Sequence, residues 1–121
     1  MNKEIAEQWV AALRSGRYEK GIGSLHDGDA FCCLGVLCDL FPGRQWSRTA
    51  DDTRHACYAG PGTETAVLPE AVRQWAGLSA ANPVATDYDT IAELNDGEGY
   101  SGGPWSFRRI ANLIEEKWEV L

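Results

Sequence analysis

Two cysteines and a histidine are the residues of this sequence best placed to carry out covalent chemistry. Cys32 and Cys33 stand at the start of an apolar segment that we expect to be a helix, and His26 lies shortly before them. A helix N-terminus lowers the pKa of a thiol, and a neighbouring histidine can serve as the base. The pattern therefore predicts a small cysteine-dependent hydrolase as one possible function. Free cysteine is a common core residue and no known nucleophile signature is matched, so burial of both thiols is the favoured interpretation.

A second set of residues could bind a ligand without reacting with it. Arginines recognise phosphate, and aromatic rings stack on bases, so these residue types around a glycine-rich loop predict a nucleotide pocket. Each residue type also has a structural explanation. The glycines could form a turn-rich link between two helices, Asp29 could cap a helix, and the aromatic residues could lie in the core. The candidate ligand-binding residues are Arg14, Arg17, Tyr18, Gly21, Gly23, Asp29, Asn95, Asp96 and Trp105.

The histidines and cysteines do not have the spacing of a metal site. The sequence contains no Cys-x-x-Cys pair, and Cys32 and Cys33 are adjacent, so their side chains diverge on a helix. Only His55 and Cys57 could share a strand face. We therefore expect neither a metal nor a cofactor.

The charge balance limits the classes of partner. The chain has 18 acidic residues against 11 lysines and arginines, for a formal net charge of −7. Such a balance opposes general binding to nucleic-acid phosphates, which needs clustered cations. It is compatible with a basic protein partner or with mimicry of nucleic acid, although solubility alone accounts for it most simply.

The beginning of the chain has neither the apolar stretch nor the small-residue cleavage site of a signal peptide. The longest apolar run is too short to span a membrane. These features predict a cytoplasmic protein with no membrane partner, whose four cysteines are thiols.

The hydrophobic pattern predicts one domain over residues 1–121, with an α+β, mainly helical fold. About five helices are expected around a buried central helix, Phe31–Phe41, capped by Asp27 or Asp29, and a small β-hairpin is expected near Cys57–Val67 with its turn at Gly60-Pro61-Gly62. The other predicted helices are Lys3–Leu13, one that begins at Pro69, Thr90–Leu94 capped by Asp89, and a last one capped by Ser106. Arg44–Arg54 has no periodicity and is predicted to be a surface loop.

Several blocks together resemble a family of small proteins encoded by tailed bacteriophages. The most specific block is Gly28–Leu40, which contains Phe-Cys-Cys-Leu-Gly-Val-Leu-Cys. The other blocks are Trp9–Tyr18, Val67–Pro69, Trp75–Leu78, Asn82-Pro83, Ala92–Asp96 and Ser106-Phe107. The loop Glu98–Pro104 is longer than the resemblance leads us to expect, and its role stays open.

The resemblance implies a phage gene product in the bacterial host cytoplasm but brings no catalytic residue and no ligand. Small accessory proteins of that kind often blunt host defences by inhibiting a defence protein, imitating nucleic acid, or capturing or destroying a nucleotide signal. Together with the residue patterns, it favours binding over catalysis. The expected partner is a nucleotide-derived signal or a host defence protein, with the cysteine hydrolase and the acidic nucleic-acid mimic as alternatives.

Overall fold

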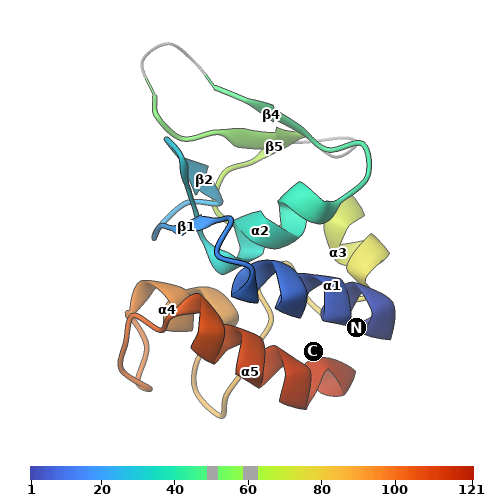
Figure 1. The fold of residues 1–121 in the computed structure, drawn as a ribbon, viewed down its shortest axis with the longest axis vertical. Coiled ribbons are helices and arrows are strands. Elements are labelled where there is room, and N and C mark those ends of the chain that lie inside the picture. The colour runs from blue at the N-terminus through green and yellow to red at the C-terminus, as the bar shows by residue number, and fades with distance from the viewer. Residues whose placement is uncertain (49–51, 59–62) are drawn as a thin grey trace.

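The computed structural model describes residues 1–48, 52–58 and 63–121. The described chain folds into five α-helices, a short 3-10 helix (η1) and two three-stranded sheets, which is an α+β arrangement as predicted. Figure 1 shows the strands β4 and β5 at one end of the molecule, the helices α4 and α5 at the other, and α1 between α2 and α5. The helices are α1 (Lys3–Arg14), α2 (Cys33–Leu40), α3 (Glu70–Ala76), α4 (Ile91–Asp96), α5 (Phe107–Lys117) and η1 (Trp118–Val120).

The first helix confirms the predicted Lys3–Leu13 segment with one more residue. The Asn2 side chain caps it by accepting a hydrogen bond from the Ile5 amide at 3.2 Å. Its apolar stripe is buried, and the Trp9 indole N–H donates to the Cys33 carbonyl at 2.9 Å. This bond fixes α1 to the beginning of α2.

The second helix is shorter than the sequence predicted. Ala30–Phe31 form strand β3 instead of the first helical turn, and Cys32, rather than Asp27 or Asp29, is the N-cap. The predicted helix start was wrong because a short apolar run does not distinguish a buried strand from a helix. The helix is buried from Cys33 to Cys38, and Gly35 lies so close to the backbone of Leu25 that a Cβ there would be 1.8 Å from its carbonyl oxygen.

Two small sheets lie beside α2. In the first, strand β3 pairs with β1 (Glu19–Lys20) in parallel and with β2 (His26–Asp27) in antiparallel orientation. In the second, β5 (Ala56–Tyr58) lies between β4 (Gln45–Ser47) and β6 (Thr63–Glu64). The predicted hairpin is present as β5 and β6, although its turn at Gly60-Pro61-Gly62 lies outside the described residues. The prediction of a surface loop over Arg44–Arg54 was wrong where β4 pairs with β5.

The remaining helices have local caps that the sequence identified in part. Gly77 and Gly97 end α3 and α4 in the left-handed conformation, and the Ser106 side chain caps α5. Thr90, not Asp89, is the N-cap of α4, where it forms a capping box with Glu93.

Asp89 instead holds the loop between α4 and α5. Its side chain is almost completely buried, and its two carboxylate oxygens accept the Tyr100 and Ser101 amide hydrogens, each at 2.7 Å. A charged acceptor for two backbone donors fixes the loop that contains Glu98. Among the described residues, no helix has the length and apolar character needed to cross a membrane.

Candidate functional site

Three segments that contribute predicted catalytic or ligand-binding residues meet at one place in the fold. They are the glycine-rich loop after β1, the N-terminus of α2 and the C-terminus of α4. Asn95 joins them: its side-chain oxygen accepts the Cys33 amide hydrogen at 3.1 Å, and its side-chain nitrogen donates to the Gly21 carbonyl at 3.0 Å. Because Asn95 is fully buried and its polar atoms are engaged, it positions this junction and does not face a ligand.

Asp96 continues this network at the surface. Its Oδ1 accepts a hydrogen bond from the Gly23 backbone amide at 3.1 Å and another from the Asn95 side-chain amide at 2.8 Å. Its Oδ2 has no hydrogen-bond partner in the part of the chain that the structure describes. The predicted residues Gly23, Asn95 and Asp96 are therefore brought together, and one carboxylate oxygen remains open.

Beside this junction lies a hollow of about 200 Å³, which we call the acidic pocket. It is defined by Ser24, Cys32, Val67, Glu93, Asp96 and Glu98. Gly23, Cys32 and Asp96 were predicted from the sequence as site residues and line this pocket, whereas Ser24, Glu93 and Glu98 were missed. The signal that could have found Glu93 is its place three residues after Thr90, where it also serves the capping box.

The three carboxylates of the acidic pocket have unused acceptor capacity. Glu93 Oε2 accepts hydrogen bonds from the Thr90 amide at 2.8 Å and the Thr90 hydroxyl at 3.0 Å, and Oε1 has no partner among the described residues. Glu98 is exposed, and its side chain forms no hydrogen bond with any residue that the structure describes. None of the ion pairs between described residues involves Glu93, Asp96 or Glu98.

Both thiols at the start of α2 are buried, which confirms the favoured interpretation of the sequence, and they are not activated as the hydrolase alternative requires. Burial raises the pKa of Cys32 to about 11, and its Sγ accepts the Gly35 amide hydrogen at 3.4 Å as the helix cap. Burial also raises the pKa of Cys33, which is completely enclosed and donates weakly to the Ile91 carbonyl at 3.8 Å. The predicted lowering by the helix dipole was wrong because desolvation of a thiolate outweighs it.

The other two cysteines are also free and buried. The interaction with the thiol of Cys57 in β5, together with burial, raises the pKa of Cys38 in α2. Among the described residues, no group of histidine, cysteine, aspartate and glutamate side chains could hold a metal ion.

His26 belongs to an aromatic stack on β2. Its ring lies 3.8 Å from Phe31 and 4.0 Å from His55, nearly parallel to both. The Cys32 thiol is engaged with the Gly35 amide of α2, and no hydrogen bond joins it to His26 in the described chain, so His26 does not serve Cys32 as a base in this arrangement. Burial and the nearby charge of His55 lower the pKa of His26, and its Nδ1 is buried without a partner in the described chain.

Tyr18 joins a polar cluster around Asp39, not the glycine-rich loop. Asp39 accepts hydrogen bonds from the Tyr18 hydroxyl at 2.7 Å, the Trp46 indole at 3.0 Å and the Arg44 guanidinium at 3.1 Å. Partial burial would raise the pKa of Asp39, but these donors and the charge of Arg44 lower it overall. Burial and the bond to Asp39 raise the pKa of Tyr18 to about 12. We call these four residues the Asp39 cluster.

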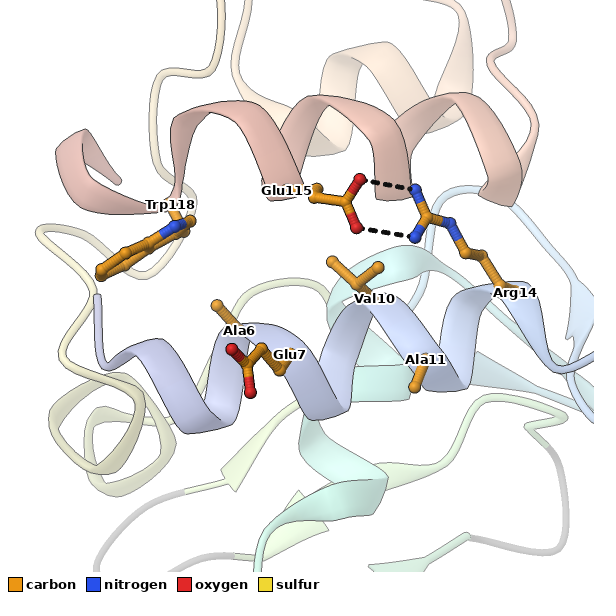
Figure 2. Close-up of a pocket in the computed structure, with 7 residues that line it drawn as sticks. All are labelled: Ala6, Glu7, Val10, Ala11, Arg14, Glu115 and Trp118. Atoms are coloured by element: carbon orange, nitrogen blue, oxygen red, sulfur yellow. Dashed lines mark hydrogen bonds and ion pairs between the residues drawn. The ribbon is translucent and has the colours of Figure 1, made fainter.

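Arg14 lines a larger groove of about 470 Å³ between α1 and α5. Figure 2 shows Trp118 at one end of this groove, the Arg14–Glu115 pair at the other, and Ala6 and Val10 between them. The Arg14 guanidinium is engaged by Glu115 at 2.8 Å and by Asn112 at 2.7 Å, so it is not free to bind a phosphate.

The last predicted ligand-binding residues lie apart from the junction. Arg17 and Asp29 are exposed on connecting segments. Trp105 is buried against α5, where the Arg109 guanidinium lies 3.8 Å from the centre of a Trp105 ring. Neither Arg17, Asp29 nor Trp105 lines the acidic pocket.

The comparison with protein families covers almost the whole chain. A family model described as "Domain of unknown function (DUF8296)" matches residues 1–118. The chain belongs to this family. No curated protein and no solved structure matches the chain. The family match spans both the acidic pocket and the Asp39 cluster, so both lie within the shared domain.

Proposed function

We propose that this protein acts by binding a host protein at the acidic pocket, without catalysing a reaction on it. The binding counters a host defence during phage infection, in the bacterial host cytoplasm. The observation that carries the proposal is the group of unpartnered polar atoms around the pocket, from Glu93, Asp96 and Glu98. Polar atoms that the fold leaves without partners are available to donors from outside. The phage context comes from the sequence resemblance.

The state of the thiols supports binding over chemistry. A nucleophilic cysteine requires a thiolate at neutral pH, whereas burial raises the pKa of Cys32 to about 11 and encloses Cys33 completely. His26 is engaged in its stack with Phe31 and His55. The residues of the hydrolase alternative thus lack both an activated nucleophile and an adjacent base.

The charge and size of the pocket favour a protein partner over a nucleotide signal. Three carboxylates around one hollow repel the phosphates of a nucleotide. A volume of about 200 Å³ is also below the usual range for a pocket that encloses a whole small-molecule ligand. It suits a single side chain presented by a larger surface.

The proposal is tested by expressing the protein in bacterial strains that each carry one defence system. We expect the plating efficiency of a restricted phage to rise with at least one system. Cys32→Ser should keep this effect because a serine hydroxyl still caps α2, although it removes the thiol. A folded Cys32→Ser protein that loses protection would support the hydrolase alternative, and no protection against any system would contradict the proposal.

The ligand class is tested separately with purified protein. Cyclic and linear nucleotides are added, the melting temperature is recorded, and the nucleotide is recovered after denaturation of the protein. We expect no stabilisation and no conversion by any nucleotide. A stabilising nucleotide that is recovered intact would replace the protein partner with a sequestered signal.

A further inference from the structure

The acidic pocket concentrates negative charge that the fold does not neutralise. Glu93, Asp96 and Glu98 come from α4 and the segment directly after it, and no arginine or lysine of the described chain forms an ion pair with them. The nearest ammonium group in this network, that of Lys20, donates to the backbone oxygen of Asn95 at 2.7 Å. The negative potential of the pocket therefore favours a ligand with a positive charge.

An unpartnered hydroxyl in the same pocket gives a second, independent indication of a ligand. Ser24 is only 9% exposed and lines the pocket, yet its hydroxyl makes no hydrogen bond to any residue that the structure describes. The adjacent backbone is fixed, because the Leu25 amide donates to the Thr65 carbonyl at 2.7 Å. The hydroxyl oxygen is not among the completely buried unpartnered atoms of the described chain, so it is reached from the pocket, and a donor that enters the pocket can bond to it.

Part of the remaining wall of the pocket is apolar, and its one amide side chain, that of Asn82, is engaged by Thr90 and by the Ala92 backbone. Ala66, Val67 and Ala92 line it beside the carboxylates. Lysine and arginine side chains combine a charged head with an aliphatic stem, and the stem packs on apolar surface while the head reaches polar groups. The apolar wall and the acidic rim match these two parts.

We infer that the acidic pocket binds one ammonium or guanidinium group on an aliphatic stem, namely a lysine or arginine side chain of a partner protein. This inference rests on the proposed function, because it names the part of the host protein that the pocket recognises. The head lies among the free oxygens of Glu93, Asp96 and Glu98, and the stem lies on Val67 and its neighbours. Ser24 accepts a further hydrogen bond from the head.

The test uses Nα-acetyl-arginine amide and Nα-acetyl-lysine amide as probes, with Nα-acetyl-citrulline amide as the matched neutral compound. Binding to the full chain is followed by NMR shifts of the Gly23 and Asp96 amides and by calorimetry. We expect saturable shifts with both cationic probes and none with the neutral one. Equal binding of the neutral compound would overturn the inference.

Matched variants locate the site. Glu93→Gln preserves the capping box, since glutamine also serves at that position, and Glu98→Gln changes an exposed side chain. Each should weaken probe binding by about threefold to tenfold, the range expected for one partly exposed charge pair. Glu116→Gln, an exposed carboxylate of α5 that does not line the pocket, is the control and should leave affinity unchanged. If all three variants lower affinity equally, the probes respond to net charge only and the inference fails.

Further outcomes distinguish the inference from a small-molecule ligand and from the proposed function alone. Butylguanidine carries the same single head and stem without the peptide groups, so it should bind no more tightly than the amide probes; exclusive binding of butylguanidine would contradict a protein side chain as the ligand. Phage protection by a wild-type protein that binds neither cationic probe would refute the inference and leave the proposed function standing, and probe binding without phage protection would do the reverse. Protection that survives in the Glu93→Gln, Glu98→Gln double variant would contradict both.

Discussion

The Asp39 cluster and the acidic pocket lie at opposite ends of α2 and use carboxylates in opposite ways. Asp39, in the last turn of the helix, has its oxygens filled by Tyr18, Arg44 and Trp46. At the other end, where Cys32 caps the helix, the pocket carboxylates keep free oxygens. The difference shows that donors to both oxygens turn a carboxylate into a structural anchor, whereas a carboxylate with one oxygen left free remains available to another molecule.

The strongest way to break the comparison is to displace α2, which positions both regions. In Gly35→Ala the new Cβ would lie 1.8 Å from the Leu25 carbonyl oxygen, a backbone atom that cannot rotate away. We expect a loss of roughly 3 kcal/mol in the free energy of unfolding, measured by urea denaturation. Alanine normally favours a helix over glycine, so a more stable protein would show that this close approach is absent.

Asp39→Asn should damage one end of α2 only. The amide removes the charge that three donors share and directs its own N–H groups toward one of them. We expect stability to fall by about 1–3 kcal/mol and the affinity for Nα-acetyl-arginine amide to stay unchanged. Tyr18→Phe, which removes one of the three bonds, is the milder comparison. A large change in affinity would mean that the two ends are coupled through the helix.

The stack of His26 with Phe31 and His55, beside the Asp39 cluster, makes the stability of the protein depend on pH. Burial and the charge of His55 lower the pKa of His26 below its ordinary value, although Asp39 and Asp29 oppose this. The unfolded chain therefore binds the proton more readily, so the contribution of His26 to stability is complete above about pH 6.5 and is lost as the pH falls through the folded-state pKa. We expect the melting temperature to drop between pH 7 and 5, and less in His26→Phe, which retains a ring between Phe31 and His55. An identical drop in both proteins would assign the pH dependence to other groups.

The smallest effect on stability belongs to the acidic pocket itself. Glu98→Gln removes a charge that has no hydrogen-bond partner in the described chain, so thermal unfolding should leave the melting temperature unchanged. The same variant should lose part of its affinity for the cationic probes. A clear loss of melting temperature would show that Glu98 serves the fold, as Asp39 does, and would remove the contrast between the regions.

The parts of the fold that depend on local chemistry were predictable from the sequence. Ser106, Gly77 and Gly97 mark helix ends because capping needs only neighbouring residues. Strand β4 was missed because a strand of three residues is defined by its partner, here through the pairing of Trp46 with Cys57. The strand at Phe31 was missed for the same reason.

Some residues of the candidate site were predictable from their types, but their position relative to one another in the fold was not. Gly23 and Asp96 were both identified, yet their contact joins positions 73 residues apart and depends on the buried Asn95. Ser24 and Glu98 show no pattern in the sequence, because their role comes from what the fold leaves unpaired around them. Whether a polar side chain keeps unused hydrogen-bonding capacity after folding depends on the whole structure.

All four native thiols are buried, which makes the surface of the described chain suitable for site-specific labelling. A cysteine introduced at the exposed position Glu116 would be the most accessible sulfur in the described chain, and a maleimide dye would attach there in preference to Cys32 or Cys33. Such a conjugate leaves the rim of the acidic pocket intact and reports the docking of a partner by fluorescence anisotropy or energy transfer. The burial of the native cysteines thereby permits optical measurements without their prior replacement.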